Sequence, residues 1–400
     1  GVTGSGKTEI YVRLIQEQLL LGNQVLFLVP EIALTTQLIK RLQKIFGQQV
    51  GVYHSKFNQN ERVEIWNSIL ENNPDNYRIV VGARSCVFLP YQKLGLVIVD
   101  EEHESTFKQY EPSPRYNGRD SAMVLGQIHD AKVLLGSATP SMETYANCQN
   151  GKFGLVALKE RFQGMQMPEI LIADLKKERR QNKNFQFFSN FLIESIKEAL
   201  DNKKQVILFQ NRRGYNPRWQ CEVCSWTPHC INCDVSLTYH KQSNSLKCHY
   251  CGYLTAPMGS CHKCQSNRLK MIGFGTEKIE DEMGILFPDA TTARLDADTT
   301  RSKNSYASIL DAFENRQVDI LIGTQMVTKG LDFDHVSLVG ILDAEDMLNR
   351  PDFRAFEKSF QLMTQVSGRA GRKNKRGKVI VQTGQVDHWV IEKVHQYDYE

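Results

Sequence analysis

The chain begins with GVTGSGKT, which matches the phosphate-loop pattern GxxxxGK[ST] at every fixed position. Such a loop turns successive backbone N–H groups inward around phosphate oxygens and opens a helix whose N-terminus faces the anion. We expect Lys7 to reach the terminal phosphates and the Thr8 hydroxyl to bind Mg²⁺. The strand leading into the loop would lie upstream of Gly1, so we expect the chain to be a piece of a longer protein. The predicted nucleotide-binding residues are Gly1, Val2, Thr3, Gly4, Ser5, Gly6, Lys7 and Thr8.

Strand-like and helix-like segments alternate along most of the 400 residues. Runs such as Gln24–Val29 suit strands, and amphipathic segments such as Glu9–Leu21 suit helices. The alternation predicts an α/β fold with parallel sheets covered by helices, and the length predicts two or three domains. We expect a first lobe over residues 1–157, a linker over 158–188, a second lobe over 189–217 and 268–395, a Cys-rich insertion over 218–267, and the start of a truncated C-terminal domain over 396–400.

Composition excludes two broad classes of protein. Hydrophobic residues make up 41% of the chain, enough to bury a core in each lobe, which excludes global disorder. The longest apolar runs, such as Leu94–Val99, fall far short of the roughly 20 residues that a membrane span requires. No membrane partner is therefore expected. The formal net charge of +4 is too small to indicate a nucleic-acid-binding protein by itself.

Acidic and basic residues lie where a nucleotide-hydrolysing enzyme needs them. The apolar run Leu94–Val99 ends in Asp100 and Glu101. Asp100 can hold Mg²⁺ through water, while Glu101 orients and deprotonates the attacking water. Arg369 and Arg372 follow a helix-like segment in the second half, and their charge suits the charge that develops on a γ-phosphate. We expect an arginine finger presented across a cleft between the lobes; a solvated acidic turn and a basic surface turn are the alternatives.

Eight of the ten cysteines crowd into residues 221–264 as four CxxC pairs. Paired CxxC segments inside a large chain are typical of zinc sites, whereas disulfide frameworks belong to small secreted domains. Four thiolates close a tetrahedral shell, so eight predict two structural Zn²⁺ ions without an open position for water. The spacing favours a nested pairing over the sequential alternative. The nested sites are Cys221, Cys224, Cys261 and Cys264 for the first ion, and Cys230, Cys233, Cys248 and Cys251 for the second.

The segment between His103 and Asp120 interleaves aromatic and basic side chains. Its two prolines and one glycine argue against a helix. Aromatic rings stack on bases of any identity and cations contact phosphates. Because the loop directly follows the acid pair, it can report DNA occupancy to Glu101; the alternative is an ordinary loop whose rings pack inward. The predicted DNA contacts are Phe107, Lys108, Tyr110, Arg115 and Tyr116.

These motifs, in this order, resemble those of superfamily 2 helicases, which implies two RecA-like parallel-sheet lobes. VPEIALT, which ends at Thr35, and GARS, with Arg84 and Ser85, look like that superfamily's single-strand-contacting motifs. GSATP at 136–140 looks like its coupling motif. The DEEH box, the aromatic-rich loop, the eight-cysteine insertion and QVSGRAGR together resemble the PriA family of replication-restart helicases. By position, this resemblance adds Gln365 to Arg369 and Arg372 as residues that act on the nucleotide, and it agrees with the nested cysteine pairing.

The resemblance implies an ATP-dependent 3′→5′ DNA helicase that unwinds stalled or collapsed replication forks and initiates primosome assembly. It implies ATP, Mg²⁺ and two Zn²⁺ ions as cofactors. It also implies as partners forked, single-stranded and duplex DNA, the single-stranded DNA-binding protein and other primosome proteins. We expect a monomer in the bacterial cytoplasm, associated with the nucleoid, and reduced thiols favour the same compartment. Two other interpretations stay open: another superfamily 2 DNA translocase, and a zinc-scaffold DNA-binding protein with an inactive ATPase.

Overall fold

The chain forms two compact units, which we call lobe 1 (Gly1–Met165 with Lys329–Leu331) and lobe 2 (Gln166–Thr328 with Asp332–Glu400). Among the described helices, none combines the length and the apolar character that crossing a bilayer demands. The predicted site residues Gly1, Thr3, Thr35 and Arg372 lie outside the described residues. The computed structural model describes residues 2, 4–30, 36–53, 59–72, 75, 77–181, 187–211, 218–233, 235–240, 244–272, 275–296, 299–300, 305–328, 333–371 and 376–399.

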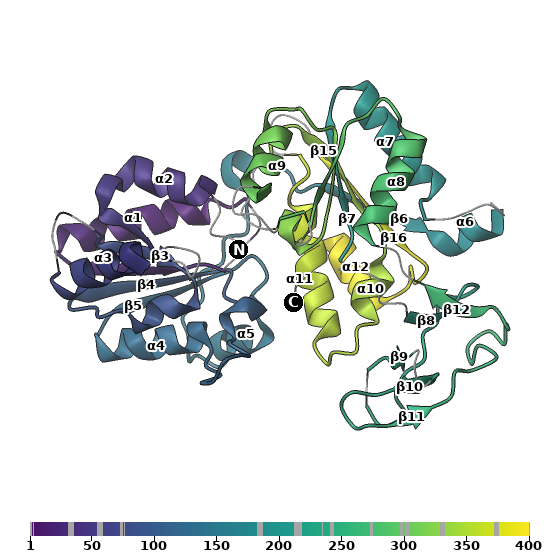
Figure 1. Cartoon of the computed structure of the whole chain (residues 1–400), viewed down its shortest axis with the longest axis horizontal. Coiled ribbons are helices and arrows are strands. Elements are labelled where there is room, and N and C mark those ends of the chain that lie inside the picture. The colour runs from purple at the N-terminus through teal and green to yellow at the C-terminus, as the bar shows by residue number, and fades with distance from the viewer. Residues whose placement is uncertain are drawn as a thin grey trace. The chain divides into compact units, whose positions relative to one another are not determined.

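Lobe 1 is a parallel five-stranded sheet in the order β2-β3-β1-β4-β5, with helices on both faces (Figure 1). Its strands are β1 (Gln24–Leu28), β2 (Val50–Tyr53), β3 (Ile79–Gly82), β4 (Leu94–Asp100) and β5 (Lys132–Gly136). Its helices are α1 (Lys7–Leu20), α2 (Thr36–Phe46), α3 (Gln59–Leu70), α4 (Gly118–Ile128) and α5 (Met142–Gln149), with short 3₁₀ helices η2 (Gly47–Gln49), η3 (Arg84–Phe88), η4 (Ser105–Phe107) and η5 (Phe162–Gly164).

The sheet of lobe 1 separates two hydrophobic cores. Successive side chains of a strand point to opposite faces, so Val25 and Phe27 pack with Ile15 of α1, whereas Leu26 and Leu28 pack on the face covered by α3 and α4. Because both faces are buried, the strands read as continuous apolar runs, which is why they are visible in the sequence.

Lobe 2 is a parallel six-stranded sheet in the order β13-β14-β7-β15-β16-β6. Its strands are β6 (Glu169–Asp174), β7 (Gln205–Phe209), β13 (Thr292–Leu295), β14 (Ile320–Gly323), β15 (Val336–Ile341) and β16 (Lys378–Thr383). Its helices are α6 (Leu175–Gln181), α7 (Asn190–Asp201), α8 (Thr276–Leu286), α9 (Ser305–Glu314), α10 (Ala344–Leu348), α11 (Ala355–Ser367) and α12 (Trp389–Gln396), with the 3₁₀ helix η6 (Gln325–Thr328). The apolar faces of α7 and α8 pack on one side of this sheet.

Residues 158–188, which include the charged run KKERRQNKN at 176–184, are not the simple linker that we expect from the sequence. Strand β6 pairs with β16 at the edge of the lobe 2 sheet, so lobe 2 begins before residue 189. The charged run forms α6 as far as Gln181, because the Asp174 carboxylate accepts hydrogen bonds from Lys176 N–H (2.8 Å) and Lys177 N–H (3.3 Å) and so caps the helix. Long charged side chains are good helix formers once a helix has begun.

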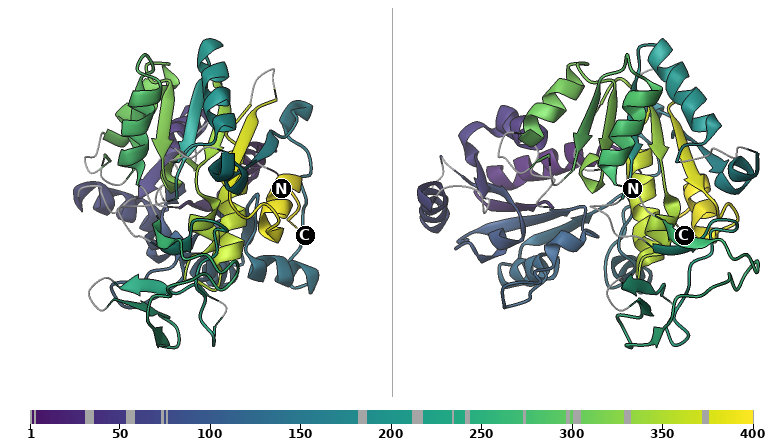
Figure 2. Two further views of the ribbon diagram at one scale, coloured as in Figure 1. Left: turned by 90° about the vertical axis from the view of Figure 1, so that its right-hand side faces the viewer. Right: turned by 45° about the vertical axis from the view of Figure 1, so that its right-hand side comes forward.

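The cysteine-rich insertion leaves and re-enters lobe 2 between β7 and α8 through an antiparallel ribbon, β8 (Arg218–Cys221) with β12 (Leu269–Ile272) (Figure 2). Beyond the ribbon lies a small antiparallel sheet in the order β11-β10-β9. Its strands are β9 (Thr238–His240), β10 (Ser245–Lys247) and β11 (Leu254–Thr255). None of the described strands of the insertion joins the six-stranded parallel sheet of lobe 2.

Candidate nucleotide and metal sites

The phosphate loop has the backbone conformation that its glycines predict. Gly4 (φ +79°) and Gly6 (φ +84°) lie in the left-handed region, and α1 begins directly afterwards at Lys7. A residue with a Cβ rarely adopts this conformation. The buried hydroxyl of Ser5 has no hydrogen-bond partner among the described residues, so it is available to an oxygen-rich ligand. These features fit a bound phosphate group.

The two predicted carboxylates lie beside the phosphate loop. Lys7 Nζ is 3.8 Å from the Glu101 Oε1 atom, and the Tyr11 hydroxyl donates a hydrogen bond to Asp100 Oδ1 (2.9 Å). Burial raises the pKa of Asp100, and the charge of Lys7 opposes that rise. Glu101 has a φ of +50°, an uncommon conformation for a residue with a side chain, and such conformations cluster at functional sites. The Asp100 carboxylate and the Thr8 hydroxyl are oxygen ligands of the kind that Mg²⁺ takes.

His103, the last residue of the DEEH box, links the acid pair to the segment GSATP. Its Nδ1 atom shares a hydrogen bond with Ser137 Oγ (2.8 Å) and lies 3.7 Å from Glu101 Oε2. Ser137 Oγ also accepts from the backbone N–H of Thr139 (3.0 Å). One imidazole ring therefore lies between this segment and Glu101.

Glu102, the third residue of the DEEH box, has a supporting role that the sequence did not predict. The side chain is buried, with 2% of the residue exposed, and it joins the DEEH box to α4 and α5. A buried carboxylate requires partners of this kind, because an unpaired one would be costly. It accepts hydrogen bonds from Ser141 N–H (2.7 Å), Thr144 Oγ1 (2.9 Å) and Arg119 Nη1 (2.9 Å).

The aromatic loop is a folded hairpin, and one of its predicted DNA contacts is wrong. Phe107 is 1% exposed and belongs to the core under α4, so its ring cannot stack on a base here. Tyr116 is half-buried and packs edge-on against Phe88 (4.8 Å between ring centroids). Tyr110 is 66% exposed and is the ring that the loop offers to a ligand.

Some basic side chains of this region donate hydrogen bonds within the protein, and others are exposed at the surface. Arg84 donates to Thr106 O (2.9 Å) and thereby holds the start of the loop. Lys108 Nζ donates to Arg115 O (2.7 Å) across the hairpin, while the Arg115 side chain is exposed. Ser85 is half-buried in η3. Arg84 therefore has a supporting contact in addition to its predicted contact with DNA.

Gln365 and Arg369, the described candidates of the QVSGRAGR segment, lie at and just after the buried C-terminal end of α11. Gln365 is 5% and Arg369 is 8% exposed. The Arg369 guanidinium donates to the carbonyl oxygen of Thr328 in η6. Arg369 thus connects α11 to the loop after β14 within lobe 2, a role that its place in the sequence did not indicate.

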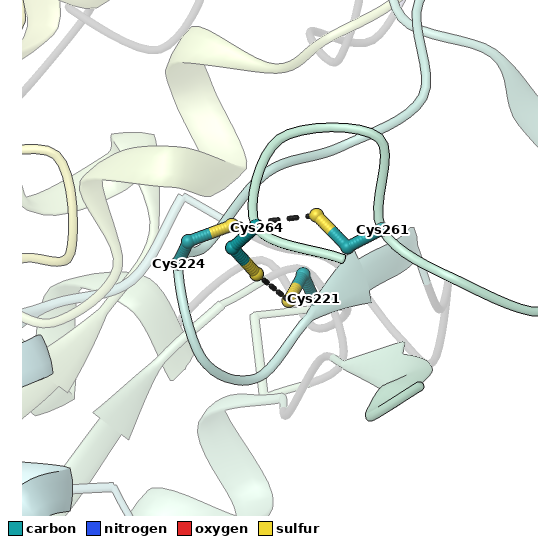
Figure 3. Close-up of side chains that lie close together, drawn as sticks. All are labelled: Cys221, Cys224, Cys261 and Cys264. Carbon is teal, nitrogen blue, oxygen red and sulfur yellow. Dashed lines mark hydrogen bonds between the residues drawn. The ribbon is translucent and has the colours of Figure 1, made fainter. Parts of the chain in front are cut away.

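The eight cysteines form two clusters in the nested arrangement, and the Sγ atoms of each cluster all lie within 4.8 Å of one another. We call Cys221, Cys224, Cys261 and Cys264 the proximal cluster and Cys230, Cys233, Cys248 and Cys251 the distal cluster. The Sγ separations of 3.6 Å (Cys221 to Cys264) and 3.5 Å (Cys224 to Cys261) can be followed in Figure 3. Zn–S bonds of about 2.3 Å place tetrahedral ligands roughly 3.8 Å apart, so both donor sets fit Zn²⁺.

Backbone groups favour the thiolate form in each cluster. Hydrogen bonding to the backbone of Tyr253 lowers the pKa of Cys251 to about 6, and the backbone of Ser266 lowers that of Cys264 to about 7. Thiolates are the form that binds a metal ion. Burial raises the pKa of Cys224 and of Cys233 in the same two clusters, so the thiolate form is favoured at one cysteine of each cluster and opposed at another.

The proximal cluster is docked on lobe 2 through Ser225, which is 1% exposed. Arg179 of α6 donates to Glu222 O (3.1 Å) and to Ser225 Oγ (3.4 Å). Gln385, which follows β16, donates to Ser225 O (3.4 Å). The segment Glu222–Ser225, which contains Cys224, is thus held by two segments of the lobe.

The distal cluster has a small core of its own, in which Leu246 is fully buried. Its Tyr250 reaches lobe 2, where its hydroxyl accepts from Phe353 N–H (3.3 Å) and its ring lies 6.4 Å from that of Phe353. Both side chains are exposed, Tyr250 by 53% and Phe353 by 69%. Water competes for such a contact, so it is weaker than a buried one.

Family models match three successive parts of the chain. The DEAD/DEAH box helicase model matches residues 1–148, and the helicase conserved C-terminal domain model matches residues 264–374. The model of the PriA DNA helicase Cys-rich region (CRR) domain matches residues 230–255, which contain the distal cluster.

Curated relatives match the chain over its whole length. The chain is 45% identical over 400 residues to the replication restart protein PriA of Bacillus subtilis (strain 168), and covers 49% of that protein. It is 43% identical over 399 residues to the PriA of Rickettsia conorii, and covers 61% of it. The chain therefore spans about half of the first and three fifths of the second. Among solved structures, the DUF1998 helicase MrfA bound to DNA matches with a TM-score of 0.57 at 14% identity, over 100% of this chain and 46% of that one, which shows the fold alone.

Proposed function

The chain belongs to the PriA family, and we propose that it is the motor region of an ATP-dependent 3′→5′ DNA helicase. In this proposal it unwinds DNA at stalled or collapsed replication forks and initiates primosome assembly for replication restart. Its partners are forked and single-stranded DNA, the single-stranded DNA-binding protein and other primosome proteins. It acts as a monomer in the bacterial cytoplasm, on the nucleoid.

The observation that carries the proposal is the convergence of Lys7, Asp100 and Glu101 at one edge of the lobe 1 sheet. Lys7 and the loop backbone hold the phosphates of ATP, while Thr8 and Asp100 hold Mg²⁺. When bound, Mg²⁺ neutralises charge that develops on the phosphates. Glu101 orients the attacking water and accepts its proton. Gln365, Arg369 and Arg372 stay predictions for the stabilisation of the developing charge.

ATP hydrolysis with and without single-stranded DNA tests the motor. We expect DNA to stimulate hydrolysis, and Lys7→Ala and Glu101→Gln each to lower the rate by at least about 100-fold, the loss typical of a removed charge-stabilising group. Glu17→Gln, on the exposed face of α1, is the matched control and should hydrolyse ATP normally. Absence of hydrolysis in the wild-type full-length protein would favour the alternative of a zinc scaffold with an inactive ATPase.

Polarity and substrate distinguish this helicase from another superfamily 2 translocase. Duplexes with a 3′ tail, a 5′ tail or a fork are offered with ATP, and strand separation is followed. We expect unwinding of the fork and of the duplex with a 3′ tail, because a 3′ tail permits 3′→5′ movement toward the duplex. Unwinding with the opposite polarity, or translocation without strand separation, would favour the other translocase.

Tyr110 is our leading candidate for DNA contact, with Thr35, Arg84, Ser85, Lys108, Arg115 and Tyr116 as the other candidates. Its exposed ring can stack on a base, and the loop that carries it begins at His103, beside Glu101. Tyr110→Ala should therefore lower DNA-stimulated hydrolysis and leave hydrolysis without DNA unchanged. An equal fall in both rates would count against coupling through this loop.

A further inference from the structure

Residues 158–162 run along the phosphate loop within lobe 1. The Val2 N–H donates to Leu158 O (2.9 Å), and the Phe162 N–H donates to Gly4 O (2.9 Å). The turn η5 closes the segment, with a hydrogen bond from Gly164 N–H to Arg161 O (3.1 Å). Two backbone hydrogen bonds therefore fix which side chains of this segment lie beside the loop.

Arg161 lies over one glycine of the loop. It is 5% exposed, and its Nε atom is 3.3 Å from the position that a Cβ on Gly4 would occupy. A buried, permanently charged guanidinium close to this backbone adds positive potential where phosphate oxygens bind.

Phe162 lies at the other glycine of the loop with most of its ring uncovered. The residue is 60% exposed, and its Cδ2 atom is 4.0 Å from the position of a Cβ on Gly6. An apolar ring contributes nothing to phosphate binding. However, a nucleotide held by its phosphates at this loop carries a flat base beyond them, and an aromatic ring can stack on a base of any identity.

We propose that Phe162 forms the nucleobase side of the nucleotide site by stacking on the base of a purine nucleoside di- or triphosphate. The hydrogen bond from Phe162 N–H to Gly4 O holds this residue beside the phosphate loop. The inference rests on the proposed nucleotide-binding function and adds to it the contact that recognises the nucleoside.

Binding of ADP and of inorganic tripolyphosphate to the 400-residue chain tests the inference, because tripolyphosphate has no base. Phe162→Ala should weaken ADP binding by about 5- to 150-fold, the equivalent of about 1–3 kcal/mol of stacking, and leave tripolyphosphate binding unchanged. Phe162→Trp should bind ADP as the wild type does. Trp66→Ala removes another exposed ring of lobe 1 (41% exposed) and should have no effect on either ligand.

Other outcomes overturn the inference in distinguishable ways. Unchanged ADP binding by Phe162→Ala would show that the ring does not contact the base. Equal weakening of ADP and tripolyphosphate would make Phe162 a support of the loop, and Phe162→Leu, which keeps an apolar side chain, would then restore both. A wild-type chain that binds neither ligand would refute the nucleotide-binding function itself.

Discussion

The proximal and distal clusters each consist of four cysteines, but they are attached to the rest of lobe 2 in different ways. Next to the proximal cluster, the buried Ser225 accepts hydrogen bonds from Arg179 and Gln385 of lobe 2. The distal cluster surrounds a small core of its own and meets the lobe at the exposed pair Tyr250 and Phe353. The same set of four cysteines can therefore serve two purposes: one cluster attaches the insertion to lobe 2, and the other surrounds the small core of the distal part.

Loss of one cluster at a time is the strongest test of this difference. Cys261→Ala and Cys248→Ala each remove a fully buried thiol, and each variant should retain one of two Zn²⁺ ions. The proximal variant should lower the free energy of unfolding of lobe 2 by about 2–3 kcal/mol, because two or three hydrogen bonds at about 1 kcal/mol each are lost with it. The distal variant should lower it by less than about 1 kcal/mol.

Bound zinc and thermal unfolding of the two variants provide the measurement. Amide hydrogen exchange in α6 and β16 locates the effect, since these elements flank the proximal contact. Equal destabilisation of lobe 2 by the two variants would contradict the assignment of different roles.

Gly384→Ala should disturb the proximal contact without touching a ligand. A Cβ at this position would lie 2.1 Å from Ser225 Oγ, so the contact must open. We expect a loss of about 1–3 kcal/mol in the free energy of unfolding, the usual effect of overpacking. Gly259→Ala, whose Cβ would meet nothing within 4 Å in the insertion, is the control. Denaturant unfolding compares the two, and similar midpoints would show that the contact at Gly384 is loose.

Arg179→Ala should have a smaller effect that is confined to the proximal cluster. It removes the hydrogen bonds to Glu222 O and Ser225 Oγ, with a cost of about 1 kcal/mol. Chelator competition should then release one Zn²⁺ faster than in the wild type and the other at an unchanged rate. The exposed neighbour Arg180 provides the control substitution Arg180→Ala. Faster release of both ions would argue that the clusters are not independent.

Tyr250→Phe should have the smallest effect, because it removes only the hydroxyl that accepts from Phe353 N–H at the surface. We expect a change below about 0.5 kcal/mol in unfolding free energy, with both Zn²⁺ ions retained. Hydrogen exchange at Phe353 N–H should nevertheless accelerate. Tyr239→Phe, whose hydroxyl bonds to Asn244 inside the insertion, should leave that amide unaffected. A large loss of stability would mean that the distal contact is a main attachment.

The sequence predicts those parts of the fold that depend on short spacings. Strand β4 is visible as an apolar run because both faces of its sheet are covered. The phosphate loop and the cysteine groups follow from fixed intervals between residues. An Asp before a run of good helix formers also predicts α6, whereas the charge of that run considered alone predicts a linker.

Contacts between distant segments could not be predicted in the same way. Glu102 finds its partners 17 and 39 or more residues away. Phe107 is buried because it packs in the core that includes Ala122 of α4. An alternation of aromatic and basic residues in the sequence does not specify whether a given ring is buried or exposed. Likewise, the contacts of Arg161 with the phosphate loop depend on a return of the chain after more than 150 residues.

The paired strands β8 and β12 have a consequence for protein engineering. Because the chain enters and leaves the cysteine-rich segment through neighbouring strands, we expect this segment to be transferable as one unit. If the segment were inserted between the corresponding strand and helix of a related protein, its own cysteines would direct its folding. Its orientation would have to be supplied by the recipient, through residues equivalent to Arg179, Gly384 and Gln385.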